Sequence, residues 1–322
     1  MLERLLKLAC GAALVLALCA VSSGGDGPFG ARSAQASYAV PNDFVYQLQN
    51  VNLSAIGKTR FDLVVMDYSR DGSDERRFSA EEIEALKASP GGRKRVLAYM
   101  SIGEAEDYRF YWQRSWDADR NGRPDSGAPA WLGPSNPEWP GNYKVRYWDP
   151  AWQQIVHQYL DKVLAADYDG VYLDIVDAYE YWGPGGGSGV DRPTADDEMV
   201  AFVKSIANYA RVTMGRPGFQ VFVQNAEGLS RYPDYVQTVS GIGKEDLFYD
   251  GNRRQPADET SYSIRRLDRF KQAGKPVFVI DYVTRQARID EFYRKAHNHG
   301  YVPYATRRDL DVLTINPGHA PD

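Results

Sequence analysis

The chain has 322 residues, which is more than one β-sandwich needs and close to the usual length of a single α/β barrel. With 43% hydrophobic residues it can bury one large core, and its formal net charge of −5 argues against a nucleic-acid-binding protein. Both cysteines lie within the first 19 residues, which excludes disulfides, cysteine-bound metals and thiol nucleophiles from the rest of the chain.

Residues 1–36 have the features of an export signal. A positively charged start precedes an apolar run over 8–21 that is too short to span a membrane, and an A-x-A cleavage pattern follows at 34–36. A lipoprotein attached through Cys19 is the alternative, which the bulky leucine before it disfavours. The sequence therefore predicts a secreted or periplasmic protein with a mature chain of 37–322 and no membrane span.

Strand-like and helix-like segments alternate along the mature chain. Apolar, β-rich runs cover residues 44–50, 61–68, 95–103, 169–177, 219–227, 240–248, 276–283 and 301–308. Amphipathic segments lie over 79–89, 149–166, 194–214, 262–274 and 287–300, with Ser79 and Thr194 at N-cap positions and Gly274 and Gly300 at the ends of their helices. No G-x-G-x-x-G turn follows the first strand. The order predicts a single-domain (β/α)8 TIM barrel with one long βα-loop, over 104–148, after the third strand.

Carboxylates recur where these strands end, at Asp67, Glu104, Glu106, Asp174, Asp177, Glu227, Glu245 and Asp281. In a barrel these ends form the active-site face, and the absence of a His or Cys cluster beside them points to proton and nucleophile chemistry. In the fourth strand, Val171, Leu173 and Ile175 share one face while Tyr172 and Asp174 share the other. We expect Asp174 inside the barrel near its mouth, either as a catalytic group or in a structural ion pair.

Five segments resemble one family: residues 101–112, 131–152, 169–182, 223–229 and 241–250. They are similar to the exported (β/α)8 glycosidases related to endo-α-1,4-polygalactosaminidase, glycoside hydrolase family 114. The resemblance implies endo-cleavage of an α-1,4-linked galactosamine or N-acetylgalactosamine polysaccharide by two carboxylates. It matches Asp174 to the proposed nucleophile and Glu245 to the proposed acid/base. Glu227 is the rival for the second role; otherwise it binds substrate beside Asn225.

The same resemblance suggests how the remaining polar and aromatic groups meet the sugar. Asp67, Glu106 and Asp177 would suit the ammonium groups of deacetylated galactosamine, and Tyr172 would help to keep Asp174 ionised. Aromatic rings are common sugar platforms, and Tyr99, Trp182 and Tyr282 are candidates, although rings also pack in cores. Arg109, near Glu106, is expected to brace an acid structurally.

Residues 117–125 have the spacing of a calcium loop. Asp117, Asp119, Asn121 and Asp125 stand at positions 1, 3, 5 and 9, but position 12 is Ala128 in place of the bidentate Glu. A structural calcium ion and a solvated turn both remain open, and we expect the turn. No metal or other cofactor is expected in catalysis. Two alternatives to the polygalactosaminidase remain: a non-catalytic carbohydrate-binding barrel and a glycosidase for another amino-sugar polymer. We expect a monomer.

Overall fold

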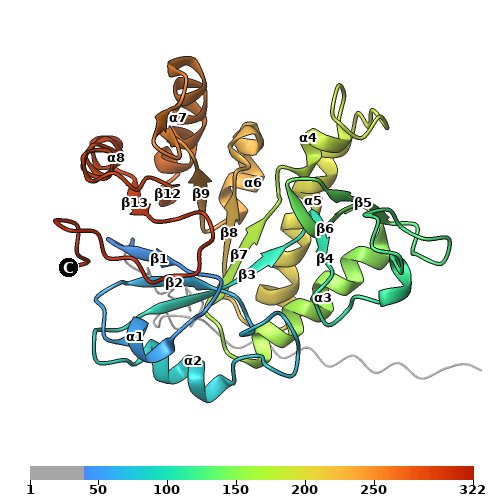
Figure 1. Ribbon diagram of the computed structural model, residues 1–322, viewed down its shortest axis with the longest axis horizontal. Helices are drawn as coiled ribbons and strands as arrows, with labels where there is room; N and C mark the ends of the chain where they lie inside the picture. Colours follow the sequence, from blue (N-terminus) through green and yellow to red (C-terminus); the bar gives the residue numbers. More distant parts are fainter. Residues whose placement is uncertain (1–39) are drawn as a thin grey trace, which may run out of the picture. The chain divides into compact units, whose positions relative to one another are not determined.

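The computed structural model describes residues 40–322, so the predicted export signal lies outside the described residues. Eight parallel strands form one sheet whose neighbours are hydrogen-bonded in the order β1-β2-β3-β7-β8-β9-β12-β13, with helices on its outside (Figure 1). The two end strands meet through side chains, because the rings of Phe44 in β1 and Tyr304 in β13 lie 5.6 Å apart. The predicted (β/α)8 barrel is confirmed as a nearly closed barrel.

The barrel strands are shorter than the apolar runs that predict them. They are β1 (Phe44–Tyr46), β2 (Leu63–Met66), β3 (Arg95–Ser101), β7 (Gly170–Asp174), β8 (Gln220–Gln224), β9 (Gly241–Glu245), β12 (Val277–Asp281) and β13 (Val302–Ala305). Each lies inside its predicted run and ends two to four residues before that run does, where the chain turns into a βα-loop. Asp174, Glu245 and Asp281 are thus the last residues of their strands.

The α-helices of the described residues are α1 (Leu53–Gly57), α2 (Ala80–Lys87), α3 (Pro150–Ala165), α4 (Ala178–Trp182), α5 (Ala195–Asn208), α6 (Pro233–Thr238), α7 (Ala257–Gln272) and α8 (Gln286–His299). Five of them, α2, α3, α5, α7 and α8, overlap the predicted amphipathic segments, whereas the short helices α1, α4 and α6 were not predicted. Ser79 is the N-cap of α2 as expected and forms a capping box with Glu82, and Gly300 ends α8 at φ 69°. Thr194 is the N-cap residue of α5, as predicted, although its side chain makes no capping hydrogen bond.

Two glycines in β9 make room for aromatic rings inside the barrel. A Cβ on Gly241 would lie 2.3 Å from the ring of Phe222, and one on Gly243 would lie 1.6 Å from the hydroxyl oxygen of Tyr172. Alternate residues of a strand point to the same side, so Glu245 continues this inward-facing row. The sequence GIGKE therefore places a carboxylate directly above a packed aromatic interior.

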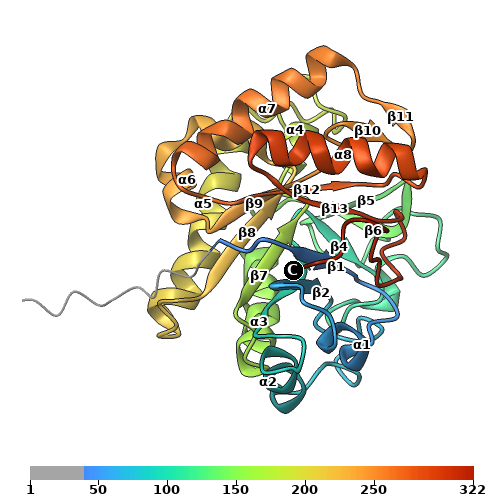
Figure 2. The same cartoon turned by 90° about the vertical axis from the view of Figure 1, so that its left-hand side faces the viewer.

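The long segment after β3 is not an irregular loop. It forms a second sheet of β4 (Glu104–Glu106), β6 (Trp139–Val145) and β5 (Leu132–Asn136), in that order. Figure 2 shows these strands on the same side of the barrel as the small hairpin of β10 (Tyr249–Asp250) and β11 (Arg253–Arg254). Both additions follow carboxyl ends of barrel strands and surround the mouth. Among the described residues, no helix is long and apolar enough to cross a membrane.

Candidate active site

The two predicted catalytic carboxylates end strands on either side of β8. The amide of Gln224, the last residue of β8, donates a hydrogen bond to Asp174 Oδ1 at 3.3 Å. The amide of Asn225, the next residue, donates to Glu245 Oε2 at 2.9 Å. Both carboxylates are half-buried. The end of one strand therefore holds Asp174 and Glu245 at the same part of the mouth.

Asp174 has hydrogen-bond donors on both carboxylate oxygens. The Tyr99 hydroxyl donates to Oδ2 at 2.8 Å, and the backbone N–H of Ile175 donates to Oδ1 at 2.7 Å. Burial raises the pKa of Asp174 well above its usual value, and the charge of nearby Glu245 raises it further. Glu245 is therefore close enough for its charge to affect the protonation of Asp174.

Glu245 is held by side chains from both neighbouring strands. The Tyr282 hydroxyl, just after β12, donates to Oε1. Asn225 binds Glu245 twice, because its amide donates to Oε2 and its oxygen accepts the backbone N–H of Glu245 at 3.0 Å. Asn225 and Tyr282, both predicted to bind substrate, are thus direct partners of the candidate acid/base.

The chain turns sharply after each of the three strands at this part of the mouth. Ile175, Asn225 and Asp246 follow β7, β8 and β9 and have φ values of 54°, 55° and 51°. This left-handed conformation is uncommon for residues other than glycine, above all for a β-branched one, and costs about 1–3 kcal/mol per residue. Such strain is concentrated at functional sites, where the surrounding structure maintains it.

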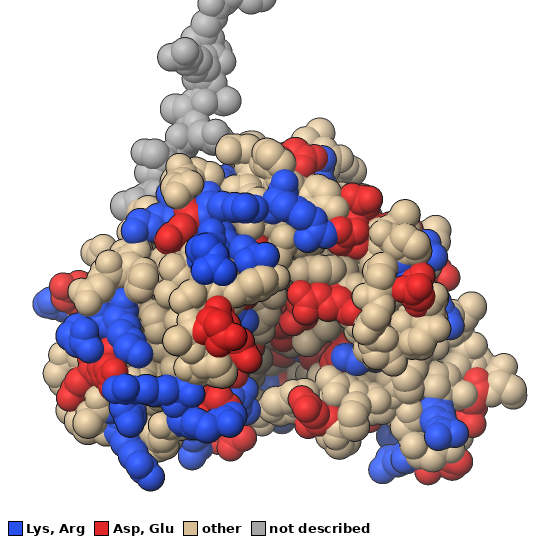
Figure 3. All heavy atoms as spheres, turned by 90° about the horizontal axis from the view of Figure 1, so that it is seen from above, with Lys and Arg blue, Asp and Glu red and all other residues tan. Residues whose placement is uncertain are grey.

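Asp177, the third predicted acid here, lies beside a pocket next to Glu245. Burial, assisted by the charge of Glu180, raises the pKa of Asp177 to about 7. The pocket measures about 230 Å³ and is lined by Asp177, Lys244 and Glu245, and by Glu259 from α7. In Figure 3, acidic side chains gather at a hollow in the face shown there. Four carboxylates, with Asp246 among them, line this pocket against one lysine, which makes it suitable for a cationic group.

Glu227, the rival acid/base, is engaged elsewhere. It is 6% exposed, and its Oε1 accepts a hydrogen bond from the Ser263 hydroxyl at 2.6 Å. The ammonium nitrogen of Lys244 lies 3.6 Å from the same oxygen. These contacts favour Glu245 over Glu227 as the partner of Asp174.

Asp67 and Glu106 are not free to bind a cationic sugar, which corrects the sequence prediction. Arg109 lies between them, at 2.8 Å from Asp67 and 2.6 Å from Glu106, and its side chain has no exposed surface. Burial raises the pKa of Asp67, although Arg109 acts in the opposite direction. The expected bracing role of Arg109 agrees with this geometry, but it engages both acids.

The predicted aromatic platforms offer no open ring face. Tyr172 has no exposed surface, and its ring lies 5.3 Å from that of Tyr46 inside the barrel. Tyr99, in its place, is the tyrosine that donates to Asp174. Trp182 is 3% exposed and packs edge-on against Trp148. The role expected of Tyr172 beside Asp174 is therefore not supported, because Tyr99 makes that hydrogen bond and the Tyr172 ring is packed inside the barrel. The substrate contact expected of Trp182 is not supported either, because packing covers its ring.

Several residues of this region were missed at the sequence level. Gln224, which donates to Asp174, is neutral and belongs to no recognisable motif. Arg308, which donates to Asp246 beside Glu245, lies far along the chain and belongs to none either. Asp281 ends its strand as expected, but its carboxylate accepts the backbone N–H groups of residues 247–249 at 2.9–3.1 Å, which fixes the loop after Glu245. The polar end of the apolar run VFVQN was the one available signal for Gln224.

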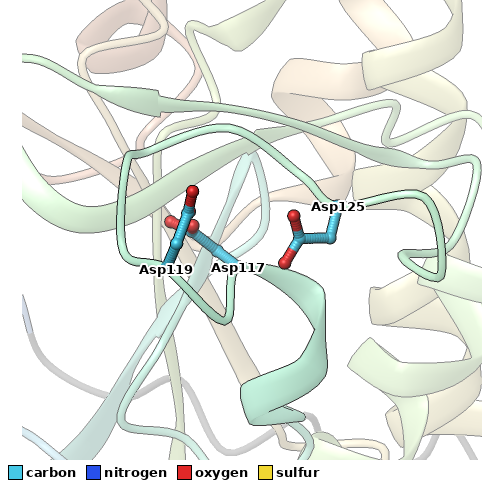
Figure 4. Close-up of side chains that lie close together, drawn as sticks. All are labelled: Asp117, Asp119 and Asp125. Atoms are coloured by element: carbon cyan, nitrogen blue, oxygen red, sulfur yellow. The ribbon is translucent and has the colours of Figure 1, made fainter.

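The calcium-like loop, which lies between β4 and β5 in the insertion after β3, brings three carboxylates together. One ligand oxygen each from Asp117, Asp119 and Asp125 lies within 4.8 Å of the others (Figure 4). Asp117 accepts hydrogen bonds from the backbone N–H groups of Asn121 and Gly122, at 3.0 and 2.9 Å, and its Oδ2 also accepts from the Tyr143 hydroxyl, at 2.6 Å. The carboxylate oxygens of Asp117 are therefore satisfied by donors from the same insertion, which agrees with the expected solvated turn.

Comparisons with known proteins identify the family and the fold. The model of glycoside-hydrolase family GH114 matches residues 29–319. An uncharacterized protein of Methanocaldococcus jannaschii is 41% identical over 283 residues, covering 85% of this chain and 78% of that one.

Two solved structures share the fold. The glycoside hydrolase domain of PelA from Pseudomonas aeruginosa is 18% identical, with a TM-score of 0.61, and the match covers 86% of this chain and 98% of that domain. Aspergillus fumigatus Ega3, solved in complex with galactosamine, is 20% identical, with a TM-score of 0.62 over 88% of this chain and 98% of that one. The family model covers nearly all of the described residues and confirms the resemblance seen in the motifs: the chain belongs to glycoside-hydrolase family GH114.

Proposed function

We propose that this protein hydrolyses α-1,4-linked galactosamine polysaccharides within the chain, with Asp174 as nucleophile and Glu245 as acid/base. The observation that carries the proposal is the pair of amides at the end of β8, which hold these two carboxylates at one part of the barrel mouth. Glycosidic hydrolysis needs one carboxylic acid to protonate the leaving oxygen and a second carboxylate to attack the anomeric carbon or activate water.

The hydrogen bonds support this division of roles. Asp174 accepts from Tyr99, Gln224 and a backbone N–H, three donors that stabilise its charged form against the pKa rise caused by burial. Glu245 accepts from the Asn225 amide at Oε2 and faces the hydroxyl of Tyr282 at Oε1, and this hydroxyl can accept as well as donate a hydrogen bond. When Oε1 of Glu245 carries a proton, the Tyr282 hydroxyl can accept that hydrogen bond, so the two groups do not both act as donors. The charge of nearby Glu245 also raises the pKa of Asp174, so the pair resists double ionisation.

The charge around the pocket supports an amino sugar as substrate. A deacetylated galactosamine unit carries an ammonium group, and Asp177 and Glu259 line the pocket beside Glu245. The related fold of Ega3 was solved with galactosamine. Endo-action and the α-1,4 linkage rest on the resemblance of the motifs, and export rests on residues 1–36. Recovery of a mature chain beginning at residue 37 from the culture medium or periplasm would test the export step.

The test is a glycan panel with product analysis by mass spectrometry. Purified protein is incubated with deacetylated and partly acetylated α-1,4-galactosaminoglycan, with chitosan and with a neutral glucan. We expect shortened oligomers from galactosaminoglycan alone. Binding without any shortened product would support a carbohydrate-binding barrel, and cleavage of chitosan alone would indicate a different amino-sugar polymer.

Aryl glycosides separate the roles of the two carboxylates. A nitrophenolate leaves without protonation, so Glu245→Gln should retain the initial burst of nitrophenol from an aryl galactosaminide. Release should then slow, because the variant lacks the base that hydrolyses the glycosyl-enzyme, and activity on the polysaccharide should fall about 100- to 10,000-fold. Asp174→Asn should lose activity on both substrates. Glu227→Gln serves as the matched control. If Glu227→Gln, rather than Glu245→Gln, shows the selective loss, the acid/base assignment moves to Glu227.

A further inference from the structure

Arg308, in the loop after the last barrel strand, reaches two residues that adjoin Glu245. Its Nη2 atom donates hydrogen bonds to both carboxylate oxygens of Asp246, each at 2.9 Å. Its guanidinium carbon also lies 4.3 Å from the ring centre of Tyr282. One cation therefore contacts the end of β9 and the residue that follows β12.

Both contacted residues control where Glu245 points. Asp246 is the next residue in the chain; it has a left-handed φ of 51°, and its backbone N–H donates to the carbonyl of Ile280 at 2.9 Å. Tyr282 donates its hydroxyl to Glu245 Oε1. Arg308 thus restrains the backbone on one side of Glu245 and the donor on the other.

We propose that Arg308 is a positioning residue for the reaction, holding the carboxylate of Glu245 in its working direction through Asp246 and Tyr282. The inference rests on the proposed acid/base role of Glu245. Without the guanidinium, the Tyr282 ring loses its cation–π partner and Asp246 loses the charge that holds its side chain. The carboxylate of Glu245 then samples more than one direction. Misplacement of a catalytic group by about 1 Å lowers the rate by about 100-fold.

The ion pair itself contributes little to folding. The side chain of Arg308 is 43% exposed and that of Asp246 is 23% exposed. Such partly exposed pairs contribute about 0–1 kcal/mol. Removal of Arg308 should therefore change activity while leaving the protein folded.

The kinetic test compares Arg308→Ala with Arg307→Ala, Arg308→Lys and Tyr282→Phe on galactosaminoglycan. Arg307 is the matched control, because this neighbouring arginine pairs with Asp311 and its side chain is 54% exposed. We expect Arg308→Ala to lower kcat about 10- to 100-fold with KM changed less than about threefold, and Arg307→Ala to leave both unchanged. Arg308→Lys, which keeps the charge, should recover part of kcat. The Arg308→Ala/Tyr282→Phe double variant should lose less than the product of the two single losses, because both act on one carboxylate.

Crystal structures of the wild type and Arg308→Ala give a second measure that needs no activity. We expect the Glu245 carboxylate of the variant to leave the Tyr282 hydroxyl or to occupy more than one rotamer. A Glu245 that stays on Tyr282 and Asn225 in the variant overturns the inference, as does an unchanged kcat. A wild type that cleaves no glycan overturns the proposed function instead, and the pair of structures still decides whether Arg308 positions Glu245.

Discussion

The buried group of Arg109, Asp67 and Glu106 allows the sharpest test of the electrostatics. In Arg109→Met, two carboxylates that are 7% and 1% exposed lose their shared cation, whose side chain has no exposed surface. Removing one member of a buried ion pair typically costs about 3–5 kcal/mol, because the remaining charge is left unpaired. For a domain of this size that corresponds to a fall in Tm of about 6–15 °C.

The loss should depend on pH with a defined sign. Unpaired buried carboxylates have pKa values raised above those of the unfolded chain, so they ionise at increasing cost as pH rises beyond about 4. The folded variant then binds more protons than the unfolded one, and its stability falls as pH rises. The difference between wild type and Arg109→Met should therefore be larger at pH 8 than at pH 5.

Urea unfolding of both proteins at pH 5 and pH 8 measures this difference. Arg70→Met, which removes a partly exposed ion pair with Glu82, is the control and should cost no more than about 1 kcal/mol. The triple variant Arg109→Met/Asp67→Asn/Glu106→Gln should recover much of the loss, because it contains no unpaired charge. A loss below about 1 kcal/mol at pH 8, or one that grows on acidification, would refute the reasoning.

Three further predictions concern the barrel mouth. Asp281→Ala leaves three backbone N–H groups without their acceptor and should destabilise the protein by at least about 1–3 kcal/mol in chemical denaturation. Asp177, whose pKa is raised to about 7, is less favourable to fold once ionised, so wild-type stability should fall between about pH 4 and pH 7, and Asp177→Asn should flatten that slope in unfolding midpoints. Gly243→Ala forces a Cβ to 1.6 Å from the Tyr172 hydroxyl and should cost about 1–3 kcal/mol, part of which Tyr172→Phe in the same chain should restore; an unchanged Tm would contradict it.

The barrel could be predicted because its pattern is local. Eight apolar runs alternate with amphipathic segments, and each signal lies within about ten residues of sequence. The points where the strands end could not be predicted, because apolar residues such as Val176 and Phe248 continue past the point where the chain turns. The antiparallel sheet after β3 was missed for a related reason, since its strands contain glycine and proline, which normally indicate a loop.

The candidate site was predictable where topology alone brings residues together. Asp174 and Glu245 meet because strand ends of a barrel converge at one face. The pairing of Asp67 with Arg109 joins residues 42 positions apart, and no local pattern reports it. The sequence therefore predicted that Asp67 is free to bind substrate, although its carboxylate is paired with Arg109.

The three left-handed residues that follow β7, β8 and β9 have a consequence for protein engineering. Glycine at position 175 would relieve the backbone strain of Ile175, and a search for heat-resistant variants would select it. The same change would loosen the peptide group that donates to Asp174. Thermal robustness and turnover should thus trade off at this position, and a stabilised barrel intended to remain an enzyme should keep the isoleucine.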